Sequence, residues 1–248
     1  MESKSLEQRW FPFCTYALND CEHKKIFCFH HAGGSASVYR KWTLEKRNVN
    51  FVCVELPGKG TRRREPFVSN FMDLLPSLGE CIIKVCAGKP FSLFGHSMGA
   101  AMAFYTANYL QKRYGVVPEK IVAAGRQAPQ DEDPSEFKSY MDDDRLIQEL
   151  EKYKATPKEI LENKELLHFV LPEVRKDYKL NESLVYHGEQ VSAPIYINCG
   201  TEDIGATQEI MENWQAVTTQ KIKEKIFTGD HFFVLNSTHY PEYLASVI

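Results

Sequence analysis

The chain of 248 residues lacks long apolar runs, an excess of positive charge and any C-x-x-C motif. No stretch approaches the ~18 consecutive apolar residues of a membrane helix, and the polar start has no apolar core of the kind that a secretory signal contains. The net charge is −3, so the chain lacks the overall basic character of nucleic-acid binders. We therefore expect neither a membrane nor a nucleic acid as a partner.

The seven cysteines are odd in number and scattered along the chain. Three of them, Cys28, Cys53 and Cys199, lie inside apolar strand-like runs, where a reduced cysteine packs as a small hydrophobic side chain. This usage fits a reducing compartment better than a disulfide framework, and the spacing is a poor match to a metal site. The cysteines therefore favour a cytoplasmic location.

Hydrophobic residues make up 43% of the chain and charged residues 25%, the ordinary balance of a globular protein with a sizeable core. Many of the apolar residues gather in short continuous runs, the pattern of strands that are buried on both faces. These runs are 26–29, 51–56, 91–94, 120–124, 194–199 and a weaker 225–227. Helix-like stretches alternate with them, at 69–87, 98–114, 206–218 and 232–246. The alternation predicts one α/β domain, residues 1–248, with a mostly parallel central sheet flanked by helices.

The connection between the fourth and fifth runs is too long for a simple crossover. It is about twice the ~30 residues of a βαβ unit. The segment is charged and helix-rich, and Pro134, Pro157 and Pro172 are expected to break it into pieces. We predict two to four helices, at about 130–190, inserted over one end of the sheet. A decorated crossover remote from any site is the alternative.

The motif Gly95-His96-Ser97-Met98-Gly99 stands between a strand-like run and an Ala-rich helical stretch. In this context G-x-S-x-G forms a strained strand-to-helix turn that exposes a serine hydroxyl at the carboxyl edge of the sheet. Glycine at both ends lets backbones approach where a Cβ would clash, and the helix N-terminus stabilises developing negative charge. The motif predicts Ser97 as the nucleophile of a hydrolase. A turn that serves only tight packing is the alternative.

A serine is a weak nucleophile until a base accepts its proton. Among the eight histidines, His231 follows the last strand-like run and directly precedes the final helical stretch. The chain order Ser…acid…His places the base at this position, whereas His96 is held within the serine turn. We therefore predict His231 as the base.

The acid of the triad has several candidates. Asp203 follows the fifth run through a short loop, and Glu202 is its direct neighbour. Asp131 and Asp133 follow the fourth run, another position at which an acid can stand, although both look like the polar beginning of the insertion. Asp230 is adjacent to the base and poorly placed to orient it. We favour Asp203.

The first run ends in His30-His31-Ala32-Gly33-Gly34-Ser35, a glycine-containing turn. A loop at this position donates a backbone N–H to the oxyanion hole in hydrolases with a serine elbow. We therefore predict the N–H groups of Ala32 and of Met98, the residue after the nucleophile, as the two donors. Adjacent histidines are also a metal-ligand pattern, but no further ligands stand at suitable spacing, so no metal is expected.

Three arginines, Arg62, Arg63 and Arg64, stand in the segment that leaves the second run at the same edge of the sheet. A run of this kind is most often a solvated loop surface. The functional alternative is an anion contact, made to a substrate phosphate or to an acidic carrier protein.

On these motifs the sequence resembles the type II thioesterases of nonribosomal peptide and polyketide biosynthesis. The matching segments run nearly from end to end of the chain. They are 29–37 with Trp42, 55–60 with Arg62 and Glu65-Pro66, 94–100, 125–129, 200–203 with Trp214, and 229–233. Two positions depart from the family pattern. His30-His31 stands where a Pro or Tyr is expected, and Gln127 stands within Gly-Arg-x-Ala-Pro.

The resemblance implies an α/β-hydrolase that cleaves thioesters in trans, removing stalled acyl groups from the phosphopantetheine arms of acyl or peptidyl carrier domains. By position, Ser97, Asp203 and His231 match the family triad. Ala32 and Met98 match its oxyanion donors. No cofactor is implied beyond the phosphopantetheine that the substrate carries, and we expect a monomer.

The resemblance also assigns the insertion, 126–190, to a helical lid that shapes the acyl chamber. A general carboxylesterase or an acyltransferase of the same fold is the rival among enzymes. A non-catalytic module that only binds the carrier is the rival outside them.

Overall fold

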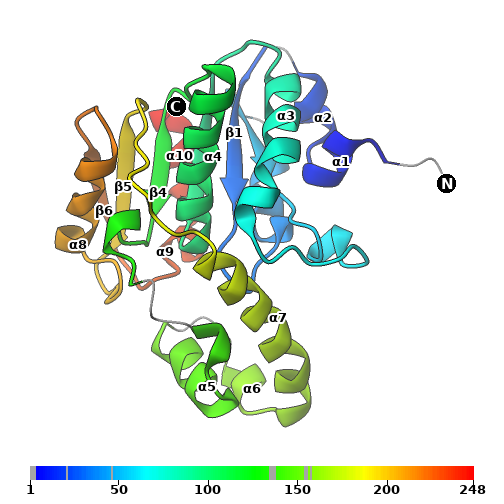
Figure 1. The fold of residues 1–248 in the computed structure, drawn as a ribbon, viewed down its shortest axis with the longest axis vertical. Helices are drawn as coiled ribbons and strands as arrows, with labels where there is room; N and C mark the ends of the chain where they lie inside the picture. The colour runs from blue at the N-terminus through cyan, green and yellow to red at the C-terminus, as the bar shows by residue number, and fades with distance from the viewer. Residues whose placement is uncertain (1–3, 21, 46, 134–137, 154–155, 157) are drawn as a thin grey trace.

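Six parallel strands form one sheet in the part of the chain that the structure describes (Figure 1). The computed structural model describes residues 4–20, 22–45, 47–133, 138–153, 156 and 158–248. The strands are β1 (Lys24–Phe29), β2 (Val49–Cys53), β3 (Phe91–His96), β4 (Ile121–Ala124), β5 (Ile195–Gly200) and β6 (Lys223–Phe227). Their order is β2-β1-β3-β4-β5-β6, and every neighbouring pair is parallel. The carboxyl ends of all six strands therefore meet at one edge.

All six apolar runs of the sequence are strands, with bounds that differ by a few residues. The second strand ends earlier than expected. The Val54 N–H still donates to Cys28 of β1, but the Glu55 N–H donates to Trp10, away from the ladder. The sixth run is weak because β6 lies at the edge of the sheet and four of its five residues are exposed. These differences follow from position in the sheet.

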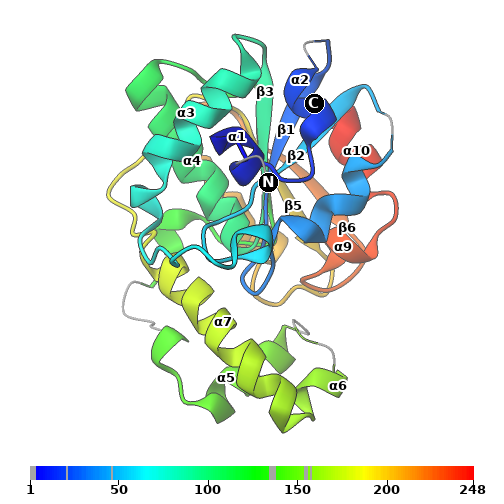
Figure 2. The ribbon, with the colours of Figure 1, turned by 90° about the vertical axis from the view of Figure 1, so that its right-hand side faces the viewer.

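Helices cover both faces of this sheet. In Figures 1 and 2, α3 (Leu75–Cys86) and α4 (Met98–Tyr114) lie on one face and α10 (Tyr240–Val247) on the other. The other helices of this part are α1 (Leu6–Trp10), α2 (Thr15–Asn19), α8 (Gln208–Glu212) and α9 (Phe233–Asn236). Short 3₁₀ turns are η1 (Ala36–Thr43), η2 (Gly60–Arg62), η3 (Phe71–Asp73), η4 (Pro129–Asp131) and η6 (Asn213–Val217). No described helix is both long and apolar enough to cross a membrane.

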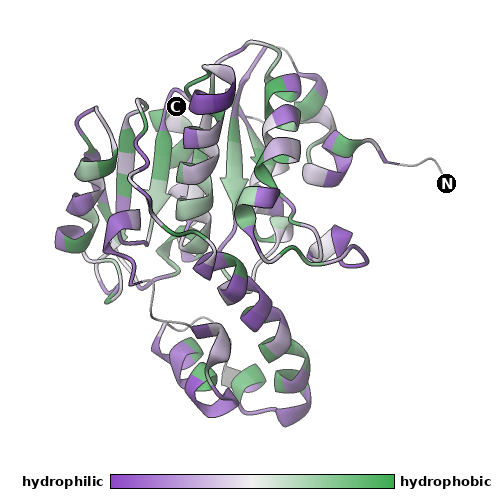
Figure 3. Ribbon diagram, viewed as in Figure 1, coloured by the Kyte–Doolittle hydropathy of each residue, from purple (hydrophilic) through white to green (hydrophobic). Residues whose placement is uncertain are grey.

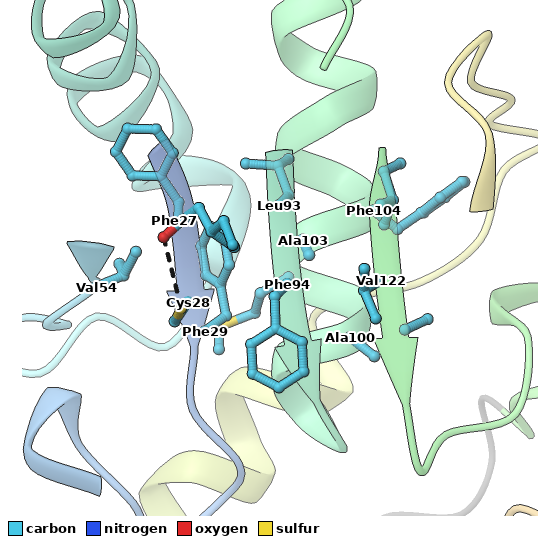
Figure 4. Close-up of a cluster of buried hydrophobic side chains, with 14 of the residues drawn as sticks. Phe27, Cys28, Phe29, Val54, Leu93, Phe94, Ala100, Ala103, Phe104 and Val122 are labelled. Carbon is cyan, nitrogen blue, oxygen red and sulfur yellow. Dashed lines mark hydrogen bonds between the residues drawn. The ribbon is translucent and has the colours of Figure 1, made fainter. Parts of the chain in front are cut away.

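The core lies between the sheet and its helices. Figure 4 shows Phe27 and Phe29 of β1, Phe94 of β3 and Phe104 of α4 among the side chains of this cluster, and all four are fully buried. Figure 3 shows the same pattern for the whole chain, with the central strands apolar and many outer helix surfaces polar. Burial of this apolar surface makes the sheet a rigid support for the loops at its edge.

A separate group of helices lies beyond the carboxyl edge of the sheet (Figures 1 and 2). It consists of η5 (Lys138–Tyr140), α5 (Asp143–Lys152), α6 (Lys158–Leu161) and α7 (Lys164–Glu182). The group has its own small apolar core, in which Leu146 and Leu150 of α5 join Leu167, Leu171 and Val174 of α7. In both views α7 reaches from this group to the body of the molecule.

The prediction that Pro172 breaks the inserted segment is wrong, because Pro172 lies inside the continuous helix α7. An interior proline removes the hydrogen bond to the carbonyl four residues earlier, here that of His168. Both residues are exposed, so the affected side of the helix faces water, while Leu171 and Val174 pack inward. Pro134 and Pro157 lie outside the described residues.

Candidate active site

Ser97 lies on a strained turn between β3 and α4. Its φ of 55° and ψ of −121° are in a region that residues other than glycine rarely adopt. A Cβ on Gly95 would lie 1.9 Å from the Gly99 carbonyl oxygen, and one on Gly99 would lie 2.1 Å from the Phe29 oxygen. Only glycine fits at both positions. This is the strand-to-helix turn that the sequence predicts.

His231 and Asp203 form a hydrogen-bonded pair at the same edge of the sheet. His231 follows β6, and its Nδ1 lies 2.8 Å from Oδ2 of Asp203, which follows β5. A carboxylate only accepts hydrogen bonds, so Nδ1 carries a proton and Nε2 is the nitrogen left to accept one from Ser97. Asp203 is only 3% exposed, and the Gly205 N–H donates to its other oxygen at 3.1 Å.

The surroundings of Asp203 favour its charged form. Burial alone would raise the pKa of this carboxyl group, but the hydrogen bond and charge of His231 lower it, and the Gly205 N–H adds to this effect. The net result is a pKa below the ordinary value. An ionised carboxylate in this position orients the imidazole and stabilises its protonated form.

The other carboxylates considered in the sequence have different partners. Asp131 accepts a hydrogen bond from Asn213, and Asp230 accepts one from the Phe232 N–H two residues along the chain. Glu202 is exposed, and Asp133 lines the cavity described below. Asp203 is the candidate whose carboxylate is hydrogen-bonded to the His231 ring.

His96 connects the serine turn to the loop of His231. Its Nε2 lies 2.7 Å from the backbone oxygen of His231, and since a carbonyl oxygen accepts, Nε2–H donates. Burial, followed by the charge of His231, lowers the pKa of His96 to about 3, so this ring is neutral near pH 7. The second position of G-x-S-x-G is variable, so no sequence signal marks this contact.

Ser97 and His231 line one cavity of about 380 Å³ together with Ala32 and Met98. Among the described residues, neither the Ala32 N–H nor the Met98 N–H has a hydrogen-bond acceptor. Met98 is the first residue of α4, where backbone N–H groups have no partner within the helix. Both amides are therefore available to an oxygen atom that enters the cavity.

The opposite wall of this cavity comes from the helical group. Leu150 lies in the last turn of α5 and Tyr153 directly follows this helix, whereas Val174 and Tyr178 lie on α7. Charged and polar side chains complete the lining, among them Arg126, Lys138, Glu149, Asn181 and Glu182. The cavity thus lies between the sheet edge and the inserted helices.

The rings of His30 and His31 contact the protein around them. The Nδ1–H of His30 donates to the His31 oxygen at 2.8 Å, and the His31 ring packs edge-on against Phe232. Burial lowers the pKa of both rings. No group of three metal-ligating side chains occurs among the residues that the structure describes. His31 is one wall of the cavity.

The three arginines differ in their surroundings. Arg62 is buried, pairs with Glu65 at 2.7 Å, donates to the Glu55 oxygen and stacks 4.4 Å from the Trp10 ring centroid. It therefore serves the fold and is not offered to a partner. Arg63 and Arg64 are exposed. Of the three arginines expected to contact an anion, only Arg63 and Arg64 are therefore accessible to one.

Glu55 is a structural residue that sequence reasoning did not single out. It is fully buried, and its carboxylate accepts the N–H of Ala36 at 3.0 Å and of Thr61 at 2.9 Å. It thereby joins the loop after β1 to the loop after β2. A carboxylate at the end of an otherwise apolar strand is the signal that could have identified it.

The thioesterase domain family matches residues 24–248. The chain is 35% identical to LgrE of Brevibacillus parabrevis, named a linear gramicidin dehydrogenase, over 84% of this chain and 81% of LgrE. It is 30% identical to thioesterase PikA5 of Streptomyces venezuelae, over 87% of this chain and 77% of PikA5. The solved structure of YbtT, a type II thioesterase from the yersiniabactin NRPS/PKS pathway, superposes with a TM-score of 0.78 at 27% identity, covering 92% of each chain.

Proposed function

This chain belongs to the thioesterase domain family, and we propose that it hydrolyses acyl thioesters on the phosphopantetheine arms of carrier domains in nonribosomal peptide or polyketide synthesis. The observation that carries the proposal is a single cavity lined by Ser97, on its strained turn, and by His231, whose ring is held by Asp203. A nucleophile, a base and an orienting acid in this chain order suit acyl transfer through a serine ester.

In the acylation step, Nε2 of His231 accepts the proton of Ser97 as Oγ bonds to the thioester carbonyl carbon. The carbonyl electron pair moves onto its oxygen, which the N–H groups of Ala32 and Met98 hold. The C–S bond then breaks, and the pantetheine sulfur leaves as a thiol with the proton from His231. A thiol is a good leaving group, so limited acid assistance is sufficient.

In the deacylation step, His231 removes a proton from water, and the resulting hydroxide oxygen bonds to the acyl carbon. The same two backbone N–H groups hold the second oxyanion. The ester bond to Ser97 breaks, the serine oxygen regains its proton from His231, and the free acid leaves. Throughout, Asp203 keeps the imidazole in one tautomer and stabilises its protonated form.

We assign the helical group of η5 and α5–α7 to the lid of this site, because its side chains line the cavity opposite Ser97. Arg63 and Arg64, which are exposed on the loop after β2, are the residues proposed to contact an acidic carrier surface. The enzyme is proposed to act as a monomer in the cytoplasm, a reducing compartment that suits its six free, buried cysteines among the described residues.

The name of LgrE denotes a dehydrogenase, but we do not extend that activity to this chain. A dinucleotide-binding unit of the Rossmann type carries G-x-G-x-x-G after its first strand, where the glycines admit a pyrophosphate. This sequence contains no such motif, and β1 is followed by His30-His31-Ala32-Gly33-Gly34-Ser35.

Turnover of an acyl-carrier thioester, measured by intact mass of the carrier, tests the proposal. Ser97→Ala is expected to abolish release of free carrier thiol while the far-UV spectrum and melting temperature stay close to those of the parent. Faster turnover of simple esters than of acyl-carrier would favour the carboxylesterase. Acyl transfer to an added amine or alcohol in preference to water would favour the acyltransferase. Absence of turnover and of fluorophosphonate labelling at Ser97 would favour the carrier-binding module.

A further inference from the structure

A fully buried carboxylate on the helical group reaches the loop beside Ser97. Asp177 of α7 is 0% exposed, and a charge in such a place is costly unless it is paired and hydrogen-bonded. Its Oδ2 accepts from Lys59 Nζ at 2.7 Å and from the Gly33 N–H at 2.6 Å. Its Oδ1 is buried without a partner among the described residues. Both donors therefore meet at one oxygen.

The Gly33 N–H belongs to the turn that carries Ala32. The Gly34 N–H donates to the His31 oxygen at 3.1 Å, which closes a four-residue turn with Ala32 and Gly33 at its centre. Gly33 has a φ of 82°, the value at the third position of a type II turn. Type I and type II turns differ by a flip of the central peptide, which here joins Ala32 to Gly33.

Asp177 accepts the N–H of that central peptide, so its hydrogen bond holds one of the two orientations. We propose that Asp177 is a positioning residue, which holds the Ala32–Gly33 peptide in its type II orientation and so anchors the turn that carries the Ala32 N–H of the oxyanion hole. This inference rests on the proposed function. It makes the lid helix α7 part of the support of the oxyanion hole, since α7 cannot move away without breaking the contacts to Gly33 and Lys59.

The positive charge of Lys59 offsets the cost of burying the Asp177 carboxylate. It is 5% exposed and comes from the loop after β2. Burial lowers the pKa of the neighbouring His30, so this ring is neutral near pH 7 and adds no second positive charge. The pair thus joins three segments that are far apart in the sequence. A local sequence pattern cannot reveal such a contact.

The first test uses Asp177→Leu with Lys59→Met, because replacing both charges avoids leaving one buried and unpaired. This double variant leaves the Gly33 N–H without its acceptor. We expect kcat to fall about ten- to a hundred-fold, the usual effect of a small misplacement in a site, with KM for acyl-carrier nearly unchanged. Asp177→Asn keeps an acceptor oxygen and should lose less activity.

A second variant reaches the same turn by another route. A Cβ on Gly33 would have its nearest neighbour at 3.6 Å, Val174 Cγ2, so Gly33→Ala creates no clash. It disfavours a φ of 82° and hence the type II form. We expect a kcat loss similar to that of the double variant, and combining the two should add little further loss. Fully additive losses would contradict a common route.

Ligand affinities separate a positioning role from a purely structural one. A trifluoromethyl ketone analogue of the thioester forms a tetrahedral adduct with Ser97, whereas a thioether analogue does not. In both variants the affinity for the ketone should fall in parallel with kcat, while the affinity for the thioether should change less than about two-fold. Leu171→Ala, which loosens the separate core of the helical group, is the control. It should not lower the affinity for the ketone more than the affinity for the thioether. An equal loss for both analogues, or an unchanged kcat, would overturn the inference.

The same variants are assayed with a small activated ester. Any acyl transfer by Ser97 uses the oxyanion hole, so the predicted kcat loss must also appear with this substrate. A parent enzyme that cleaves the ester but no acyl-carrier would therefore refute the proposed function and still test Asp177. A parent enzyme that cleaves acyl-carrier, with Asp177 variants equally active, would refute the inference alone.

Discussion

At the level of single residues, the two glycines of the serine turn permit contacts that any side chain would prevent. Gly99→Ala would place a Cβ 2.1 Å from a backbone oxygen, which cannot move aside as a flexible side chain can. We expect the free energy of unfolding to fall by roughly 3 kcal/mol or more, measured by urea titration. Gly88→Asn is the control, because nothing lies within 4 Å of a Cβ there and Asn tolerates a positive φ. Similar losses in both variants would contradict this account.

Neutral, buried His96 makes the fold sensitive to acid. Its folded-state pKa of about 3 lies below the ordinary 6.5, so between these values the unfolded chain binds a proton that the folded chain does not. The stability that His96 contributes is complete above pH 6.5 and is lost as the pH falls toward 3, by at most about 1.4 kcal/mol per pH unit.

His96→Asn removes this titration and keeps a side-chain N–H that can donate to His231. Urea unfolding between pH 6.5 and 4 should therefore depend less steeply on pH in this variant, by up to one proton. The m-value should stay constant, so that the change is one of stability and not of the unfolding reaction. An unchanged pH slope would show that His96 is not the residue responsible.

The residues of the site differ in how far they could be predicted. Ser97, Asp203 and His231 follow strand ends in a fixed chain order, and the structure places them at one edge of the sheet. The contacts of Asp177 depend on a helix that folds back over a turn about 140 residues earlier, and no local pattern encodes that distance. Sequence reasoning therefore finds groups with recognisable chemistry more readily than the residues that position them.

At the level of elements, the loop after β2 carries one buried arginine, Arg62, that stabilises the fold, and two exposed ones, Arg63 and Arg64. Arg62→Ala removes the contacts to Glu65, the Glu55 oxygen and the Trp10 ring, and should lower the free energy of unfolding by about 1–3 kcal/mol. Charge reversal at Arg63 and Arg64, which are exposed, should change it by less than about 0.5 kcal/mol.

Carrier-dependent kinetics give the complementary result for these arginines. Arg63→Glu with Arg64→Glu should raise KM for acyl-carrier several-fold at low salt, and the difference should shrink at high salt because exposed charges are screened. Turnover of a small ester, which needs no carrier contact, serves as the control and should not change. Unchanged carrier kinetics would make this loop an ordinary solvated surface.

The strands were predictable because each contains an apolar run, and the elements that differ have physical reasons. β6 is an edge strand with mostly exposed residues, so its run is short. Pro172 lies on the solvent side of α7, where the loss of one hydrogen bond is tolerated. Periodicity and proline positions report local preference, whereas packing decides where an element ends.

At the level of the whole molecule, the cavity belongs to neither the sheet nor the helical group alone. The sheet edge supplies Ser97, His231, Ala32 and Met98, and the helical group supplies the facing wall. Figure 2 shows the two parts one above the other, with α7 extending between them. An inserted helical segment could be predicted from its length and composition. The size of the cavity and the link through Asp177 could not, because both depend on how the two parts pack.

The central claim is that the acyl group passes through Ser97, and a rapid-quench experiment with acyl-carrier tests it most directly. Peptide mass mapping of the quenched enzyme should find the acyl group on the peptide containing Ser97 before free acid accumulates, with up to one free carrier released per enzyme in the first turnover. An acyl group on another residue, or free acid released by Ser97→Ala at the parent rate, would contradict the account.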